Sequence, residues 1–190
     1  MKTICFTGPR PKKLFGFDNL DDYKPLYQTL SKQILQFYNQ GYLRFISGGA
    51  QGVDQLAFWV VNALKQKHPE ACILNIVYQP FANQSDRWPP LGLFSKFDYQ
   101  RMLSIVDQVV DISKKKNIDI SSTFGINKAL IERNKSMVDD SDTVLGVYKH
   151  NQDFMEDKHS GAANCLQYAK KMNRGIYLID PDTLDIKQIN

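Results

Sequence analysis

The 190-residue sequence lacks several features that would assign a protein to a class at once. Its three cysteines, Cys5, Cys72 and Cys165, are an odd number without a CxxC pair, so neither a disulfide framework nor a zinc knuckle is indicated. No apolar run approaches about 18 residues, and the apolar run at the N-terminus is too short for a secretory leader. We therefore expect a protein of the reducing cytoplasm that has no membrane-spanning segment.

Patterns for a metal site or a catalytic serine are missing too. The three histidines, His68, His150 and His159, have no metal-ligand spacing to one another or to a cysteine. No GxSxG motif is found, and no Ser–His–Asp order is suggested. We expect no metal and no cofactor that the protein requires.

An excess of charge of one sign is also lacking. The chain has 24 Lys+Arg and 20 Asp+Glu, which gives a net charge of +4. This balance suits an anionic ligand but gives little support for a nucleic-acid partner. Hydrophobic residues make up 43% and charged residues 23% of the chain, as in ordinary globular proteins. The length predicts a single domain over residues 1–190, and a homodimer is compatible with it.

The sequence does contain a repeated pattern, in which a short apolar run precedes an amphipathic helix. Apolar runs predict strands at Lys2–Thr7, Leu43–Ile46, Ala71–Tyr78, Gln108–Ile112, Thr143–Tyr148 and Gly175–Ile179. Helical spacing predicts helices at Tyr23–Gln40, Val53–Leu64, Tyr99–Val106, Phe124–Val138 and Gly161–Met172. Loops are expected at Asn83–Phe94 and Ser113–Ser122, and a short edge strand after Pro181. We therefore predict an α/β fold: a Rossmann-like, doubly wound, mostly parallel sheet with helices on both faces.

Ligands of open α/β sheets bind at the carboxyl ends of the strands, where this sequence has small, polar, glycine-containing turns. The first turn is Thr7-Gly8-Pro9-Arg10. Gly8 lets the backbone approach a ligand closely, and Arg10 can hold a phosphate through two hydrogen bonds. The alternative is a tight turn with a surface arginine, and this motif alone favours the alternative.

The second turn leads from a strand directly into a helix. Free backbone N–H groups and the helix dipole bind anions at such a point. The phosphate-binding candidates here are Ser47, Gly48, Gly49, Ala50 and Gly52. Asp54 can cap the helix or accept a hydrogen bond from a ribose hydroxyl. The spacing is neither GxGxxG nor the Walker lysine motif, which argues against an ordinary dinucleotide or ATP-hydrolysis site. We favour phosphate or nucleotide binding over a purely structural turn.

Two later segments add candidates. Arg133 and Asn134 lie on a predicted helix that leads into the fifth strand, although composition alone favours a solvated helical face. A last turn offers Ser160, Gly161 and Ala162 before the final helix. Ser160 can serve as the N-cap, and the free amides behind it can form a second anion site.

Trp88 is the candidate for stacking on a nucleobase. It lies beside Arg87 in the expected loop after the third strand. An aromatic ring next to a cation can cover a base, but local packing is the more frequent role of such a residue.

These motifs together carry a resemblance to a known family. Residues 46–57, ISGGAQGVDQLA, resemble the SGGARGID-x-x-A segment of the DNA-processing protein DprA (Smf). The opening TGxRP, the RN-x-x-MVD-x-SD of residues 133–142 and the Gly-containing turn of residues 160–169 resemble the YpsA-like family of the SLOG superfamily. The superfamily joins DprA with the LOG phosphoribohydrolases, and the resemblance covers nearly the whole chain. It implies a Rossmann-like fold that binds a nucleotide or a derivative such as ADP-ribose.

The sequence departs from its relatives at the last turn. Ser160-Gly161-Ala162-Ala163-Asn164 stands where YpsA-like proteins have GGT-A-N. LOG enzymes carry a carboxylate shortly after this turn, whereas residues 158–179 contain no Asp or Glu. Cleavage of an N-glycosidic bond needs such a group.

We therefore predict a protein that binds a nucleotide or nucleotide-derived small molecule and acts as a sensor or binding module. One alternative is a nucleotide hydrolase of the phosphoribohydrolase type, with Asp54 as its candidate catalytic carboxylate. A second alternative is DprA-like binding of single-stranded DNA, which needs a basic groove with stacking aromatics. The one compact basic run, residues 114–116, makes DNA the least favoured of the three.

Overall fold

The computed structural model describes residues 1–189 and has an α/β architecture. Its seven strands are β1 (Lys2–Thr7), β2 (Tyr42–Ser47), β3 (Leu74–Gln79), β4 (Gln108–Asp111), β5 (Thr143–Val147), β6 (Gly175–Ile179) and β7 (Ile186–Ile189). Six α-helices connect or flank them: α1 (Lys24–Asn39), α2 (Val53–Lys67), α3 (Lys96–Ile105), α4 (Ile112–Lys115), α5 (Thr123–Asp139) and α6 (Gly161–Lys171). Two short 3₁₀ turns, Pro11–Lys13 and Leu20–Tyr23, precede α1.

The strands form one sheet in the order β4-β3-β2-β1-β5-β6-β7. Neighbouring strands are parallel except β6 and β7, which pair antiparallel. The order reverses its direction at β1, because β2 lies on one side of β1 and β5 on the other. This doubly wound, mostly parallel sheet is the predicted Rossmann-like fold, and β7 is the predicted edge strand.

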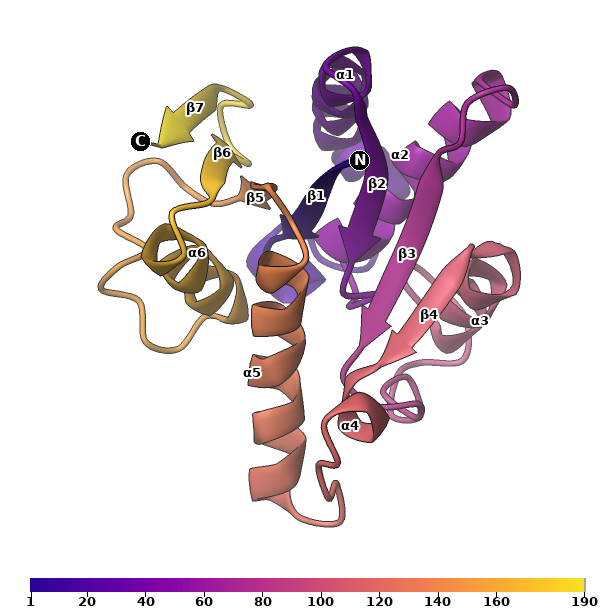
Figure 1. Cartoon of the computed structure of the whole chain (residues 1–190), viewed down its shortest axis with the longest axis vertical. Coiled ribbons are helices and arrows are strands. Elements are labelled where there is room, and N and C mark those ends of the chain that lie inside the picture. Colours follow the sequence, from indigo (N-terminus) through magenta and orange to yellow (C-terminus); the bar gives the residue numbers. More distant parts are fainter. Residues whose placement is uncertain (190) are drawn as a thin grey trace.

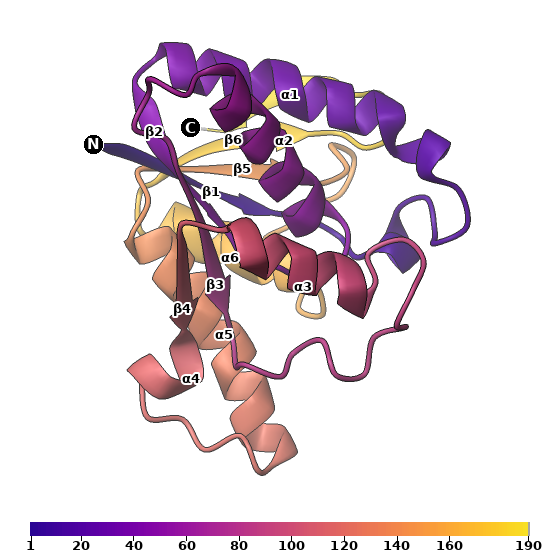
Figure 2. The ribbon, with the colours of Figure 1, turned by 90° about the vertical axis from the view of Figure 1, so that its right-hand side faces the viewer.

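Helices cover both faces of the sheet, as Figures 1 and 2 show. One face packs against α1 and α2 through side chains such as Phe6 and Phe45, while α5 and α6 cover Cys5 and Ile46 on the other. Residues 5 and 6, like residues 45 and 46, therefore point to opposite faces, as the pleat of a strand requires. Separate clusters of buried apolar side chains therefore cover the two faces of the sheet, which explains why the strands read as nearly continuous apolar runs.

Several predicted boundaries are wrong, among them the start of α3, which lies at Lys96 rather than Tyr99. Ile112, which we assigned to the end of a strand, begins α4, so the segment Ser113–Ser122 is not wholly a loop. The Asp111 carboxylate caps this helix by accepting the N–H of Lys114 at 3.1 Å, a local bond that apolar periodicity does not reveal. The third strand begins at Leu74 rather than Ala71, because Ala71 and Ile73 form a turn after α2.

Candidate functional site

The candidate site lies where the strand order reverses. β1 is paired with β5 from Ile4 and Thr143 to Thr7 and Gly146, so the turns that follow these two strands leave the same edge of the sheet. The turn after β2 is their neighbour. The first, second and last predicted turns thus follow strands whose carboxyl ends lie at one edge of the sheet, the place where open α/β sheets bind ligands.

A buried ion pair joins the second turn to α5. Nη1 of Arg133 lies 3.0 Å from Oδ2 of Asp54, and the two side chains are only 10% and 8% exposed. The same carboxylate oxygen accepts the N–H of Ala50 at 3.2 Å. Burial raises the pKa of Asp54 above its ordinary value, and Arg133 opposes that shift. Asp54 therefore anchors Arg133 against the turn.

Gly48 makes room for this arginine. A Cβ atom at position 48 would lie 1.4 Å from Nη1 of Arg133 and 2.6 Å from Oδ2 of Asp54. No side chain fits there while the ion pair is in place, so glycine at this position is a requirement of the Arg133–Asp54 contact.

Asn134 makes the corresponding contact with the last turn. Its Nδ2 donates to the Gly161 carbonyl at 3.0 Å and lies 3.4 Å from Oδ1 of Asn164. Arg133 and Asn134 are both buried, contrary to a solvated helical face. Consecutive residues of α5 therefore connect the start of α2 with the start of α6.

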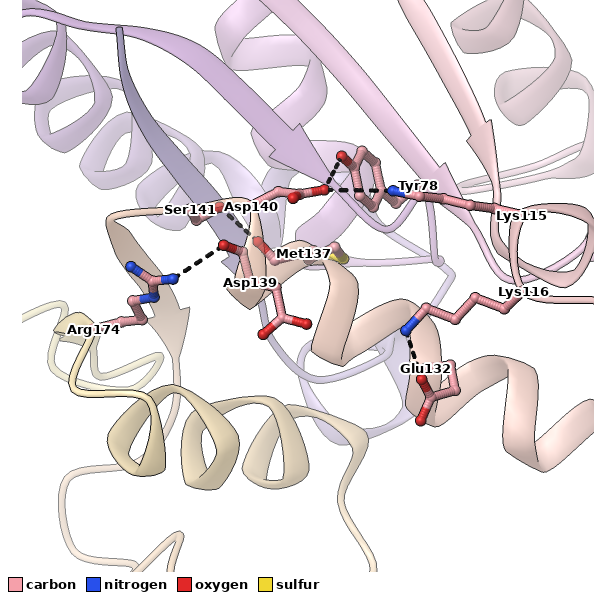
Figure 3. A network of polar contacts seen from close by, with 9 residues as sticks. All are labelled: Tyr78, Lys115, Lys116, Glu132, Met137, Asp139, Asp140, Ser141 and Arg174. Atoms are coloured by element: carbon pink, nitrogen blue, oxygen red, sulfur yellow. Dashed lines mark hydrogen bonds and ion pairs between the residues drawn. The ribbon is translucent and has the colours of Figure 1, made fainter.

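Five contacts hold the C-terminal half of α5 and the two residues after it in position, and Figure 3 shows them. They join the Tyr78 hydroxyl to Asp140 (2.6 Å), Lys115 Nζ to Asp140 (3.9 Å), Lys116 Nζ to Glu132 (2.7 Å), the Ser141 hydroxyl to the Met137 carbonyl (2.7 Å) and Arg174 to the Asp139 carbonyl (3.1 Å). Burial, followed by the hydrogen bond to Asp140, raises the pKa of Tyr78 to about 12, so its hydroxyl remains a donor at neutral pH. The network ties α5 to β3, α4 and the segment before β6, and it fixes the helix that carries Arg133.

The other glycines of the first two turns pack against protein atoms. A Cβ at Gly8 would lie 2.4 Å from Val53, one at Gly49 would lie 2.9 Å from Tyr99, and one at Gly52 would lie 2.7 Å from the Pro9 carbonyl. Gly52 also has a φ of +91°, which favours glycine. These glycines allow the first two turns to pack closely against protein atoms. The glycine pattern of the sequence does not distinguish this packing role from the close approach of a ligand.

The last turn is organised by an acid that the sequence analysis missed. Oδ1 of Asp157 accepts the N–H groups of His159 and Ser160, both at 3.0 Å, and its Oδ2 accepts the Tyr148 hydroxyl at 3.0 Å. Ser160 is the N-cap of α6, as predicted, and accepts the Ala163 N–H at 3.3 Å. The spacing Asp-x-His-Ser is typical of an Asx turn and was the available signal for Asp157.

The remaining candidates are divided between the interior and the surface. Thr7, Ser47 and Ala162 are buried, whereas Arg10 and Gly161 are exposed. A Cβ at Gly52 would lie 3.4 Å from the Cα of Arg10, which places the backbone of Arg10 beside the second turn. Within residues 1–189, the Ser47 hydroxyl and Nε of Arg133 are buried without a hydrogen-bond partner. Such groups are rare in folded proteins and are expected where a ligand or water binds.

Trp88 packs edge-on against Tyr99, with ring centroids 5.2 Å apart, and is half-buried. The Tyr99 hydroxyl donates to Oε1 of Gln79 at 3.0 Å and accepts Nε2 of Gln84 at 2.6 Å. This polar cluster borders Gly49 and was not anticipated, because its members come from β3, α3 and the loop between them. Base stacking by Trp88 stays a prediction.

Comparison with known proteins shows the family to which the chain belongs. The model of the YspA SLOG family (YpsA) matches residues 4–184. The chain belongs to this family. It is similar to the uncharacterized SPbeta prophage-derived protein YoqJ of Bacillus subtilis (strain 168), with 36% identity over 145 residues, 73% of this chain and 77% of that protein. A UPF0398 protein of Halalkalibacterium halodurans is 30% identical over 190 residues, 97% of this chain and 91% of that protein.

In this SLOG family member, the carboxylates near the turns are Asp54 and Asp157. Asp157 lies before the last turn, and its two oxygens hold backbone N–H groups and Tyr148. Among the residues that the structure describes, no three His, Cys, Asp or Glu side chains gather as metal ligands. Over the same residues, no helix combines the length and apolar character needed to cross a membrane.

Proposed function

We propose that this SLOG protein binds a nucleotide or nucleotide-derived small molecule at the turns after β1, β2 and β5, as a sensor or binding module. One observation carries the proposal: Arg133 is anchored by Asp54 at the start of α2, and within residues 1–189 its buried Nε has no hydrogen-bond partner. A guanidinium beside the N-terminus of a helix is a favourable setting for a phosphate.

Two further features support an anionic ligand at this position. Arg10 is exposed at the end of the first turn, and its backbone lies beside Gly52 at the start of α2. The start of α6 carries exposed Gly161, whose Cβ position has no atom within 4 Å. A phosphate there would meet backbone and cationic groups from two sides, while the half-buried ring of Trp88 offers aromatic surface for the remainder of the ligand.

Binding is favoured over hydrolysis because of the contacts of Asp54. Its carboxylate is engaged by Arg133 and by the Ala50 N–H. A catalytic carboxylate has to reach the substrate or a water molecule, and this one is occupied by its own partners. Overnight incubation with nucleoside monophosphates and NAD, followed by chromatography, tests the alternative, and product formation that Asp54→Asn abolishes would establish it.

Single-stranded DNA is a less suitable ligand. Two lysines of the basic run already face acids: Lys116 pairs with Glu132 at 2.7 Å, and Lys115 lies 3.9 Å from Asp140. These contacts lower the positive charge that a DNA backbone would meet. A gel shift at two salt concentrations tests this, since a DNA binder would show a strong, salt-dependent shift.

Calorimetry against AMP, ADP-ribose, NAD and a cyclic nucleotide tests the main proposal. We expect saturable binding of at least one of them with one site per chain. If none binds at millimolar concentration to protein whose circular dichroism shows a folded α/β domain, the proposal is wrong.

A further inference from the structure

A cavity of about 420 Å³ lies apart from the glycine turns. Its walls come from the segment 149–155 that follows β5, from α6, and from the β6–β7 hairpin. In Figure 1 these elements gather at the β7 edge of the sheet. The volume lies within the range of about 300–1,000 Å³ that is typical of small-molecule sites. None of its lining residues belongs to the site proposed above.

Three separate elements each contribute a lysine to this cavity. Lys149 comes from the segment after β5, Lys170 from α6 and Lys187 from β7. Lys149 is paired with Asp182 at 2.7 Å. Within residues 1–189, Lys170 and Lys187 make no ion pair, so their charges are available to an outside anion.

One acidic side chain, Asp153, also lines the cavity. Its Oδ1 accepts the N–H of Met155 at 2.8 Å, which assigns this carboxylate to the local turn. Three lysines against one aspartate leave the lining positive. Since Asp182 neutralises Lys149, the attraction for an anion depends mainly on Lys170 and Lys187.

The floor of the cavity is apolar and firmly held. Phe154 and Leu178 are 6% and 4% exposed, and Ile189 packs against the same core. Nε2 of Gln167 donates to the Phe154 carbonyl at 2.7 Å, which holds that segment against α6. The ring nitrogen Nε2 of His150 lies 3.2 Å from the Leu178 carbonyl and joins the segment to β6. The floor therefore does not depend on a ligand for its shape.

We propose that this cavity binds an amphipathic organic anion, whose acidic group contacts Lys170 and Lys187 and whose apolar or aromatic part lies on Phe154, Leu178 and Ile189. Ammonium groups form charge-assisted hydrogen bonds with phosphates, sulfonates and carboxylates. The apolar floor selects against a bare inorganic anion, because such an ion cannot use that surface.

Three probes separate the two parts of the proposal. The dye 8-anilinonaphthalene-1-sulfonate carries both an aromatic body and a sulfonate, N-phenyl-1-naphthylamine carries the body alone, and inorganic pyrophosphate carries charge alone. Fluorescence titration of the full chain measures binding of each dye, and displacement of the bound sulfonate measures binding of pyrophosphate. We expect saturable 1:1 binding of the sulfonate, and much weaker binding of the uncharged dye and of pyrophosphate.

Charge-reversal variants locate the bound probe. Lys170→Glu combined with Lys187→Glu should weaken binding of the sulfonate at least about tenfold, because two charge-assisted contacts become repulsive. Lys171→Glu is the matched control: Lys171 is exposed at the end of α6 but does not line the cavity. Equal affinity in the double variant and the wild type, or an equal loss in the control, would overturn the proposal. Unchanged far-UV circular dichroism verifies that each variant folds.

Failure of this proposal is distinguishable from failure of the nucleotide proposal. AMP binding is measured separately by calorimetry, and the lysine variants leave the glycine turns unaltered. Binding of AMP without binding of the dye would overturn the present inference alone. The reverse result would support the inference and contradict the nucleotide site.

Discussion

Arg133 and Asp54, 79 residues apart in the chain, form a buried ion pair with an Nη1–Oδ2 distance of 3.0 Å. The pair joins the middle of α5 to the first turn of α2 across the carboxyl edge of the sheet. The cost of burying these two charges is offset only while both partners are present. Removing one partner should therefore lower the stability of the fold much more than removing both.

The ion pair makes a prediction for stability. Arg133→Met should lower the free energy of unfolding by about 3–5 kcal/mol, because it leaves the Asp54 carboxylate buried without its partner. Arg133→Met combined with Asp54→Asn should recover most of that loss, since no unpaired charge remains. Urea denaturation at pH 7 measures both variants. A double variant as unstable as the sum of its single variants would show that the pair is not coupled.

The space beside Gly48 makes a second prediction. Gly48→Ala should destabilise the fold by about 1–3 kcal/mol, since its Cβ would occupy the position of the Arg133 guanidinium. Gly161→Ala is the control, because that Cβ meets open space, and its effect should stay within about 0.5 kcal/mol. Thermal unfolding of both variants decides the matter, and equal effects would contradict the close approach at Gly48.

The proposed ligand contact of Arg10 makes a third prediction. Arg10→Ala should weaken nucleotide binding by about 1.5–3 kcal/mol, or roughly 10- to 100-fold, if its guanidinium contacts a phosphate. Lys12→Ala, an exposed cation two residues later, serves as the control. Calorimetry with whichever nucleotide binds best supplies the comparison, and an equal loss in both variants would indicate general electrostatic attraction instead.

The hydrogen bonds that the Asp157 carboxylate accepts in the last turn make a prediction about pH. The hydrogen bond from the His159 backbone N–H, which outweighs burial, holds the pKa of Asp157 below its ordinary value of 3.8. An acid with a lowered folded-state pKa stabilises the fold above the unfolded value, and it loses this contribution as the pH falls through the folded value. The stability difference between wild type and Asp157→Ala should therefore be full above about pH 5 and shrink below pH 4.

Urea denaturation of both proteins across this pH range measures that difference. Asp153→Ala is a useful comparison, since Asp153 accepts the Met155 N–H in a neighbouring turn and should leave the cap of α6 intact. A stability difference between wild type and Asp157→Ala that stays constant down to pH 3 would rule out a stabilising role of the ionised Asp157 carboxylate.

Much of the architecture could be predicted from the sequence because strands and helices differ in the periodicity of their apolar residues. The apolar run at Lys2–Thr7 coincides with β1, the run at Thr143–Tyr148 extends one residue beyond β5, and the helical spacing after Gly52 coincides with α2. Errors arose where one side chain redirects the backbone, as Asp111 does when it caps α4, a short helix that was not predicted. A short cap of this kind has no periodic signal.

The candidate site likewise has features that the sequence predicts and features that it does not. The glycine turns could be recognised, but their packing could not: Gly52 faces the Pro9 carbonyl, and Gly48 faces Arg133. Composition favoured a solvated surface for Arg133 and Asn134, yet both are buried. Sequence spacing carries no information on which charged residues meet across 79 positions.

The order of strands, helices and glycine turns followed from the sequence by itself, because each depends on contacts between residues a few positions apart. Tertiary structure alone decided that Arg133 and Asn134 would connect two helix starts, and that lysines from three elements would surround one cavity. Those arrangements depend on how the parallel sheet brings distant segments together. The strand order of the sheet depends in turn on how side chains pack on both of its faces.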